Sequence, residues 1–324
     1  MITKKIKNLL NKIRSSKPKI LVLGDVMIDS YIYGDVKRIS PEAPVPIIDA
    51  KKNIDRLGGA GNVVLNLQNL GVEVNLATII GNDFNGRLFE SLLKKNNLST
   101  QFVLKSKNVN TTKKTRFLSG SSQLLRMDND SKGFKKRDSA LLERKIIPII
   151  TNYDAIIISD YNKGVCSELL IKKVIFSANK EGISTFIDPK GDKWGKYLNA
   201  TCLTPNIAEI EGELKQSFSS DAEFKKAAAA LNAKYKLDYS LITRGASGIT
   251  YYDGHTVHHQ KVGKKEVYDV SGAGDTVIAC FAASLSSKIG LSNALELSSF
   301  IASEVVAHIG TIPFNEEMLK VYNA

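Results

Sequence analysis

The strongest chemical signal in this sequence is a glycine-rich turn in front of an apolar segment. The turn spans Asp269–Asp275 (DVSGAGD), and residues 276–285 are nearly all apolar or small, which predicts a buried helix beginning at about Asp275. Backbone N–H groups that converge at a helix N-terminus form an anion site together with the positive end of the helix dipole. The residues expected to form this site are Gly272, Ala273 and Gly274.

An aspartate in the first turn of such a helix repels a bound anion. Asp275 makes sense there if it takes a proton from an attacking hydroxyl while the N–H groups hold a phosphoryl group in transfer. The alternative is a capped helix in which Asp275 only interacts favourably with the dipole. The turn by itself is compatible with both interpretations.

A second glycine-rich turn, Leu57–Asn62 (LGGAGN), leads into a predicted helix over Val63–Leu70. Its glycines allow a ligand to approach the backbone closely, and Asn62 can offer an amide to sugar hydroxyls. A dinucleotide site would need G-x-G-x-x-G directly after the first predicted strand, where this chain has Asp25–Asp29 (DVMID). A P-loop ending in Gly-Lys-Ser/Thr is also absent from the sequence.

Two further motifs each combine a strand with a polar turn. Asn206 and Glu209 lie three residues apart in Thr204–Glu209 (TPNIAE), so they share one helix face. They can hold water around a magnesium ion bound to phosphates, or they can simply cap the helix. Leu241–Gly248 (LITRGASG) is a strand followed by a glycine-bearing turn, which suits a nucleotide phosphate or ribose.

The elements that must position these residues alternate between short β-rich runs and helical patterns. The predicted strands are Lys19–Gly24, Val72–Gly81, Ala155–Ser159, Ile183–Asp188 and Tyr239–Thr243. The predicted helices cover residues 61–70, 87–96, 139–150, 167–179 and 221–234. This alternation predicts βαβ units and a largely parallel sheet in an α/β fold, where ligands bind beyond the carboxyl ends of the strands.

Residues 32–49 and 110–127 interrupt the alternation. Both segments contain β-formers with Pro and Gly punctuation, and we interpret them as antiparallel strands of a small lid outside the main sheet. Strands this few cannot bury much surface alone, so we expect them to close over a ligand or to pack on a partner. Their apolar residues, which predict a homodimer formed through the lid, are Ile32, Val45, Ile47, Phe117 and Leu124.

Composition narrows the class of protein further. The chain has 324 residues, 43% hydrophobic and 24% charged, which fits a globular protein with a large core. No apolar run is long enough for a membrane span. The three cysteines are far apart, which indicates a reducing cytoplasm without disulfides or zinc. The histidines at 255, 258 and 259 favour a solvated strand over a metal site.

The net charge of +12 is concentrated at the N-terminus. Residues 1–20 hold seven Lys or Arg and no acidic residue, and apolar residues recur there at helical spacing. We expect an amphipathic helix that docks on the domain, with a membrane-surface or nucleic-acid contact as the alternative. Nucleic-acid binding as the main function is disfavoured because aromatic residues are not interleaved with the charges and no recognition motif is present.

Taken together, these motifs resemble those of the PfkB/ribokinase family of sugar kinases. LGGAGN is similar to the first family signature, DVSGAGD to the second, and TPNxxE and ITRGxxG lie between them in the expected order. Within the family, four segments are similar to D-glycero-β-D-manno-heptose 7-phosphate kinases: Arg38–Pro46, Gln123–Arg126, Ser159–Gly164 and Asp188–Gly191.

The resemblance implies a ribokinase-like three-layer α/β/α sandwich with a mainly parallel sheet and a small β lid. It covers residues 19–324, after a basic helix over residues 1–18. It also implies a role for each matched residue. Asp275 is the base and Gly272, Ala273 and Gly274 are the anion hole. The nucleotide and magnesium side is formed by Asn206, Glu209, Thr243, Arg244, Gly245 and Gly248, with Asn206 and Glu209 acting on the metal through water.

On the sugar side the resemblance implies Asp29, Gly58, Gly59 and Asn62. A phosphate already on the sugar needs cations, for which the candidates are Arg126, Lys163 and Lys190. Asp269 and Val270 match a position where related kinases hold a monovalent cation.

The implied reaction transfers the γ-phosphoryl group of ATP, with Mg²⁺, to the anomeric hydroxyl of heptose 7-phosphate, which serves ADP-heptose and lipopolysaccharide synthesis. The chain matches only the kinase half of a bifunctional heptose kinase/adenylyltransferase, so a separate adenylyltransferase is a candidate partner. Two alternatives remain from the residues: another PfkB kinase for a hexose or pentose, and a non-catalytic sugar- or nucleotide-binding regulator. Asp275 disfavours the regulator, because a pure binder gains nothing from a base.

Overall fold

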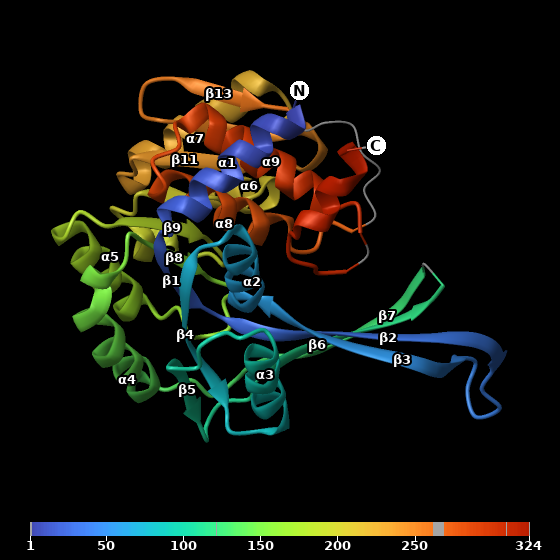
Figure 1. Ribbon diagram of the computed structural model, residues 1–324. Coiled ribbons are helices and arrows are strands. Elements are labelled where there is room, and N and C mark those ends of the chain that lie inside the picture. The colour runs from blue at the N-terminus through green and yellow to red at the C-terminus, as the bar shows by residue number, and fades with distance from the viewer. Residues whose placement is uncertain (1, 121, 262–268, 309, 324) are drawn as a thin grey trace.

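The computed structural model describes residues 2–120, 122–261, 269–308 and 310–323. Within these ranges a nine-stranded sheet runs through the molecule in the order β13-β12-β11-β10-β9-β8-β1-β4-β5 (Figure 1). All neighbouring pairs are parallel except β11-β12 and β12-β13. The predicted α/β fold with a mainly parallel sheet is therefore confirmed.

The strands of the main sheet are short, as expected for βαβ units. Their bounds are β1 (Lys19–Gly24), β4 (Glu73–Gly81), β5 (Phe102–Ser106), β8 (Ala155–Ser159), β9 (Ser184–Asp188), β10 (Cys202–Leu203), β11 (Tyr239–Thr243), β12 (Ile249–Tyr252) and β13 (Val257–Gln260). The α-helices are α1 (Ile2–Ser16), α2 (Ala60–Leu70), α3 (Phe84–Lys95), α4 (Lys136–Ile146), α5 (Glu168–Lys180), α6 (Ile207–Leu214), α7 (Asp221–Tyr235), α8 (Ala273–Ser286) and α9 (Leu291–Val305).

Each face of the sheet buries its own hydrophobic core. Because side chains alternate along a strand, Ile20 and Val22 of β1 face one core while Leu21 and Leu23 face the other. The first core is covered by α1, α2, α3, α8 and α9, and the second by α4, α5, α6 and α7. The result is the predicted three-layer α/β/α sandwich.

The basic N-terminal segment docks on this sandwich. Ile6, Leu10 and Ile13 of α1 are fully buried in the first core. On its exposed side Lys5 pairs with Glu296 of α9 and Arg14 pairs with Glu316. Among the described residues, no helix has the length and apolar character needed to cross a membrane.

A second, four-stranded sheet projects from the sandwich and forms the lid (Figure 1). We define the lid as β2 (Val26–Ile39), β3 (Pro46–Gly59), β6 (Thr112–Ser119) and β7 (Ser122–Asn129), which lie in the order β3-β2-β6-β7. The strands extend beyond the predicted segments because β2 follows β1 after a single residue and β3 continues to the start of α2.

The register of the lid gives its two faces different chemistry. Tyr31 of β2 lies opposite Arg116 of β6, which lies opposite Arg126 of β7. One residue further along, Ile32 lies opposite Phe117 and Phe117 opposite Leu125. Since neighbouring residues of a strand point to opposite faces, one face carries Arg116 and Arg126, and the other carries Ile32, Phe117 and Leu125 together with polar residues such as Lys113 and Thr115.

Several local expectations needed adjustment. The glycine turn at 57–62 is split between the end of β3 and the start of α2, and α8 begins two residues before Asp275. Strand β5 and helix α9 were not predicted, because their apolar residues do not stand out at a single period. The histidine segment forms the antiparallel pair β12 and β13, as expected for that stretch, and His259 lies 3.0 Å from the Thr250 hydroxyl.

Candidate active site

Asp275 lies in the first turn of α8 and is almost completely buried. One carboxylate oxygen accepts a hydrogen bond from the Asn62 amide at 2.9 Å, and the other accepts one from the Tyr161 hydroxyl at 2.8 Å. Thr276, the next residue of α8, donates to Asn66 at 3.3 Å, which ties α8 to α2. The carboxylate is thus held by two donors from elements remote in sequence.

The surroundings of Asp275 suit a general base. Burial is the main cause that raises the pKa of Asp275 from 3.8 to about 6, and the charge of Asp29 adds to this effect. The hydrogen bonds from Asn62 and Tyr161, and the charge of Lys114, act in the opposite direction. A base with a pKa near the working pH is ionised and still accepts a proton readily.

The turn before α8 has the backbone shape that an anion site requires. Gly272 is the N-cap with a φ of 83°, and a Cβ there would lie 2.8 Å from the Asn62 amide nitrogen. A Cβ on Gly274 would meet nothing within 4 Å, so the backbone faces open space at this point. The first-turn N–H groups of Gly274 and Asp275 have no acceptor inside the helix. Together with the dipole of α8, they form a place for a phosphoryl group beside the base.

The lid brings charged side chains to the same place. Asp29 of β2 accepts a hydrogen bond from the guanidinium group of Arg116 at 2.6 Å and one from the Thr311 hydroxyl at 3.3 Å. Asp29 is buried but keeps acceptor capacity for sugar hydroxyls, since a carboxylate has about four lone-pair sites.

Gly58 and Gly59 are required by this packing. A Cβ on Gly58 would lie 2.2 Å from a carboxylate oxygen of Asp29. Gly59 has a φ of 58°, and a Cβ there would lie 2.6 Å from the backbone oxygen of Asp25. Both glycines therefore let β3 pass close to Asp29 and to the base of β2. This is the close backbone approach that the LGGAGN turn predicted.

The motif at Asn206 and Glu209 forms a capping box at the start of α6. The Asn206 side chain accepts from the Glu209 N–H at 3.0 Å, and the Glu209 side chain accepts from the Asn206 N–H at 2.9 Å. Lys190 also pairs with Glu209 at 2.7 Å. Burial raises the pKa of Asp188 well above its ordinary value, and the charges of Glu209 and Asp275 add to the effect.

The nucleotide-side residues of β11 lie next to this cap. Thr243 and Asn206 form an isolated parallel β-bridge, so the two motifs share the carboxyl edge of the sheet. Arg244 is buried: it pairs with Asp221 at 2.6 Å, donates to Thr250 and lies 4.4 Å from the centre of the Phe224 ring. Arg244 is therefore engaged in contacts that brace α7 against the sheet.

The turn Gly245–Gly248 after β11 has a glycine at each end. Gly245 has a φ of 56° and open space beside it, and Gly248 has a φ of 91° against the backbone of Gln260.

Asp269, matched to a cation position, accepts hydrogen bonds from the backbone N–H groups of Ser271 and Gly310. Val270 is largely exposed.

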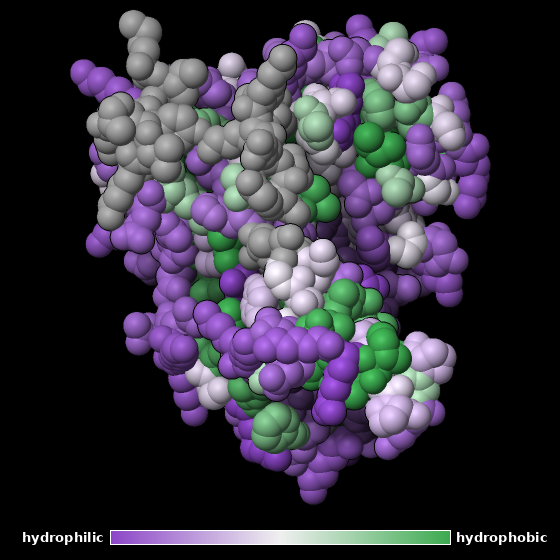
Figure 2. Space-filling model, turned by 90° about the vertical axis from the view of Figure 1, so that its right-hand side faces the viewer, coloured by the Kyte–Doolittle hydropathy of each residue, from purple (hydrophilic) through white to green (hydrophobic). Residues whose placement is uncertain are grey.

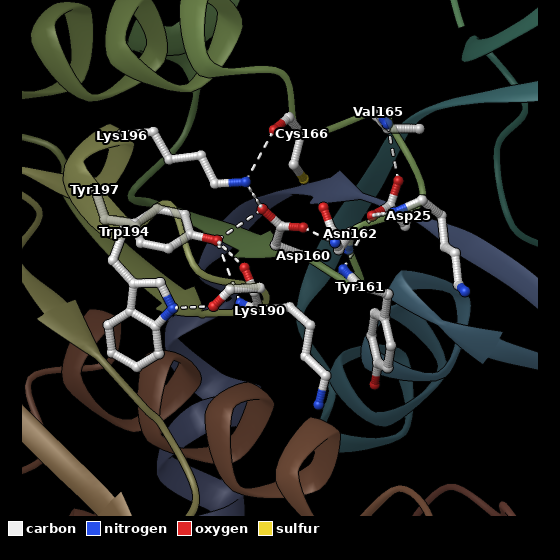
Figure 3. A network of polar contacts seen from close by, with 12 residues as sticks. Asp25, Asp160, Tyr161, Asn162, Val165, Cys166, Lys190, Trp194, Lys196 and Tyr197 are labelled. Carbon is white, nitrogen blue, oxygen red and sulfur yellow. Dashed lines mark hydrogen bonds and ion pairs between the residues drawn. The ribbon is translucent and has the colours of Figure 1, made fainter. Parts of the chain in front are cut away.

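The loop after β8 carries residues that the sequence reasoning did not assign (Figure 3). Both oxygens of the buried Asp25 accept backbone N–H groups of this loop, from residues 161, 163 and 165. Asp160 is bound by Lys196 and by the Tyr197 hydroxyl. Possible metal-ligand atoms of Asp25, Asp160 and Cys166 lie within 4.8 Å of one another. The two carboxylates already bind loop N–H groups, Lys196 and Tyr197, so we interpret the cluster as one that holds the loop.

The candidate phosphate ligands separate into two places. Lys163 pairs with Asp130, just after β7, at 2.7 Å. Burial lowers the pKa of Lys114, and the charges of Lys163 and Arg126 lower it further, so these three cations lie near one another at the lid. Lys190 lies on the other side, with Glu209.

A signal for the missed residues was present in the sequence. Asp188 ends β9 and Tyr161 follows β8, where polar groups line the binding edge of a parallel sheet. Lys114 and Arg116 lie two residues apart on β6 and therefore share one face of the strand. Which face of the lid this is depends on a register that the sequence does not give.

The model of the pfkB family carbohydrate kinases matches residues 17–318, and the chain belongs to that family. Carbohydrate kinases of this family use ATP and Mg²⁺. A protein of Methylobacillus flagellatus named bifunctional protein HldE is 41% identical over 303 residues, which are 93% of this chain and 62% of that protein.

Other relatives agree with this assignment. The bifunctional protein HldE of Campylobacter fetus is 39% identical and covers 90% of this chain and 63% of its own length. The chain thus spans less than two thirds of the length of these relatives. Phosphofructokinase-2 from Escherichia coli, in complex with potassium, superimposes with a TM-score of 0.79 at 17% identity over 94% of this chain and 97% of its own. Ribokinase of Arabidopsis thaliana, with ribose and ATP, gives 0.75 at 18% identity over 95% and 99%. The ribokinase-like fold is confirmed.

Proposed function

We propose that this chain is an ATP-dependent kinase that phosphorylates D-glycero-D-manno-heptose 7-phosphate at the anomeric hydroxyl to give the 1,7-bisphosphate. One observation carries the proposal: Asp275 stands at an open helix N-terminus with its pKa raised mainly by burial, and Asp29 and Lys114 of the lid are close enough to act on its charge. Relatives at 37–41% identity are named bifunctional protein HldE, which supports a heptose substrate. The four segments that resemble heptose 7-phosphate kinases support the same substrate.

The site supports direct transfer. Asp29 accepts hydrogen bonds from sugar hydroxyls and orients the ring, and Asp275 takes the proton of the anomeric hydroxyl. That oxygen then bonds to the γ-phosphorus of ATP as the bond to ADP breaks. The N–H groups before and within the first turn of α8 hold the phosphoryl oxygens, and the lid excludes water from the reaction.

The site also suits a magnesium ion. Burial raises the pKa of Asp188 and the charge of Glu209 raises it further, so the two carboxylates lie near each other, and carboxylate oxygens are ligands that Mg²⁺ prefers. Asn206 and Glu209 would hold the ion through water. When bound with the nucleotide, it would offset the charge of the phosphates. For the monovalent cation, Asp269 is the candidate residue.

The substrate is tested by a panel of sugars. Phosphoryl transfer is measured with heptose 7-phosphate, unphosphorylated heptose, fructose, fructose 6-phosphate and ribose at equal concentrations. We expect the highest kcat/KM with heptose 7-phosphate. A higher value with a hexose or pentose would replace the proposed substrate, and binding without transfer to any sugar would favour the regulator.

Lys163 and Lys190 are expected to act on different substrates, the phosphorylated sugar and ATP respectively. Lys163→Ala should raise KM for the phosphorylated sugar by about tenfold, because it removes a charge-assisted contact at the lid. Lys190→Ala should act mainly on KM for ATP, because Lys190 lies with Glu209. The exposed Lys172→Ala, which breaks a pair on α5, is the control. Equal effects of Lys163→Ala on phosphorylated and unphosphorylated heptose would remove Lys163 from the phosphate site.

We propose further that two copies associate through the apolar face of the lid. Leu125 and Met127 on this face of β7 are more than half exposed. A hollow of about 250 Å³ lies on the same face, lined by Ser30, Ile32, Asn53, Lys113, Thr115, Phe117, Met127 and Asn129. Figure 2, turned so that the lid points towards the viewer, shows hydrophobic side chains gathered in the lower half of the molecule. A symmetric dimer would cover this face and brace the lid.

The dimer is tested by light scattering at micromolar concentration. Wild type should have the mass of two chains, and Phe117→Asp should have the mass of one, because burial of an added charge at the contact disfavours the interface. Phe176→Asp, at an exposed phenylalanine of α5, is the matched control and should remain a dimer. A monomeric wild type contradicts the proposal.

The proposed reaction also places the chain in the cytoplasm, where ATP is available. The match to the HldE protein of Methylobacillus flagellatus covers 62% of that protein. We propose an adenylyltransferase as the partner activity in the pathway, acting on the sugar after the kinase, because the HldE relatives are named bifunctional.

A further inference from the structure

Tyr161 connects a rigid loop to the base. Its hydroxyl donates to one oxygen of Asp275 at 2.8 Å, and its backbone N–H donates to Asp25 at 2.9 Å. Figure 3 shows its side chain pointing away from the polar network that surrounds Asp25 and Asp160. The ring lies beside Gly59, where a Cβ would be 3.4 Å from a ring carbon.

The loop has little freedom to move. Asp25 receives three backbone N–H groups from it, and Asp160 at its start is held by Lys196 and Tyr197. Asp160 also accepts from the Asn162 N–H at 2.7 Å. The Tyr161 hydroxyl is consequently presented to α8 in one fixed place, as a preorganised donor must be.

We propose that Tyr161 is a positioning residue for the base: its hydroxyl fixes the Asp275 carboxylate in the orientation that accepts the proton of the sugar hydroxyl. This inference rests on the proposed function. Asn62 and Tyr161 each occupy one lone pair, on different oxygens of Asp275. Since a carboxylate has about four such sites, lone pairs remain free for the substrate on an anion whose rotation is blocked.

Tyr161 holds its own proton throughout. Burial raises the pKa of Tyr161 well above its ordinary value, and the charge of Asp275 adds to this effect. The hydroxyl is therefore a donor at every pH at which the protein works, and the substrate proton ends on Asp275. In the free enzyme the same hydrogen bond stabilises the ionised form of Asp275 and so lowers its pKa.

Other charged groups act on the base and must be separated from Tyr161. Asp29 of the lid raises the pKa of Asp275 and Lys114 lowers it, while Asp188 of β9 interacts with it as a like charge. Burial raises the pKa of Asp25 to about 6, so it titrates in the same range. A change confined to the Tyr161 hydroxyl leaves all four groups and the backbone contact to Asp25 in place.

The test is the pH profile of Tyr161→Phe. Loss of the donor should move the acid limb of kcat/KM upwards by about one pH unit. At about pH 5 the variant should be roughly tenfold below wild type, and near pH 8.5 within about threefold, since the base is ionised there in both. The phosphate of the sugar titrates near pH 6 in all variants alike, so only the difference between them counts.

Tyr153→Phe is the matched control, because it removes a hydroxyl that donates to Asn75 far from the site. Its profile should coincide with that of wild type. A Tyr161→Phe profile that is lowered equally at every pH would indicate a structural role only and would overturn the proposal.

A second measurement does not depend on activity. Carbon-13 NMR of labelled aspartate carboxyls, with the Asp275 signal assigned from its absence in Asp275→Asn, gives the titration midpoint directly. The midpoint should rise in Tyr161→Phe and fall in Tyr161→3-fluorotyrosine, whose hydroxyl is a stronger donor. An unchanged midpoint in the fluorinated protein refutes the inference even if the Phe variant does not fold. Absence of kinase activity in wild type would refute the proposed function alone.

Discussion

Asp275→Asn is expected to lower kcat by about 10²- to 10⁴-fold, the usual scale for loss of a general base. Asparagine keeps the shape of the side chain and one acceptor oxygen, but it cannot take a proton at neutral pH. Nucleotide binding should be retained, because the N–H groups of the α8 turn and the residues at Asn206 do not change. Turnover with saturating ATP and sugar, together with the nucleotide Kd, measures both expectations.

The pH dependence of wild type provides the companion measurement. Since burial raises the pKa of Asp275 to about 6, kcat/KM should fall as the pH decreases through that value. Asp49→Asn, at an exposed position of the lid, is the control and should leave turnover unchanged. A variant Asp275→Asn that keeps more than about a third of wild-type turnover would contradict the assignment of the base.

The parts of the site that the sequence predicted are those encoded locally. DVSGAGD contains the anion site and the base within seven residues, and a turn followed by a small apolar segment places both at one helix end. LGGAGN likewise predicts close approach, and the structure shows Gly58 against Asp29. These motifs work because the backbone geometry and the chemistry lie in the same few residues.

The parts that the sequence did not predict depend on distant partners. Asn62 and Asp275 are 213 residues apart, and Tyr161 and Asp275 are 114 apart, so no local pattern indicates that they meet. The pairing of Arg116 with Asp29 requires the parallel register of β2 and β6. A shift of this register by one residue would turn Arg116 to the opposite face, and the sequence pattern of β6 does not specify it.

The fold, like the site, was predicted from the sequence where it is encoded locally and was not predicted where it depends on distant pairing. Alternation along the chain predicted the main sheet, because each βαβ unit is itself local. The lid was predicted as an interruption of this alternation, but its strand order and its two chemically different faces come from pairing between β2 and β6 across a long stretch of chain. The division of the cations between Lys163 at the lid and Lys190 at Glu209 could be seen only in the structure.

Asp29→Asn is expected to lower kcat/KM for the sugar by about 10²-fold, while KM for ATP stays within about threefold. Asp29 has donors on both oxygens, the Arg116 guanidinium group and the Thr311 hydroxyl. An asparagine at position 29 would turn its NH₂ group towards one of them and would leave a single acceptor oxygen for the sugar hydroxyls. The half-buried guanidinium group of Arg116 would also lose its counter-charge.

Two comparisons make this result specific. Asp35 lies on β2, as Asp29 does, and Asp35→Asn breaks its exposed pair with Lys51 of β3, so this variant should have little effect. Gly58→Ala should act in the same direction as Asp29→Asn, because its Cβ would displace the Asp29 carboxylate. Unchanged sugar KM in both Asp29→Asn and Gly58→Ala would mean that Asp29 does not contact the sugar.

The acid limb of the pH profile of kcat/KM in Asp29→Asn tests the direction in which Asp29 shifts the pKa of Asp275. The negative charge of Asp29 raises the pKa of Asp275, so its removal should move the limb to lower pH. Tyr161→Phe should move the same limb to higher pH, because it removes a donor. Opposite shifts from two residues on different elements would require both to act on one titrating group, and Asp275 is the described carboxylate that the Tyr161 hydroxyl contacts and that Asp29 influences. Shifts in the same direction would mean that the limb reports another group.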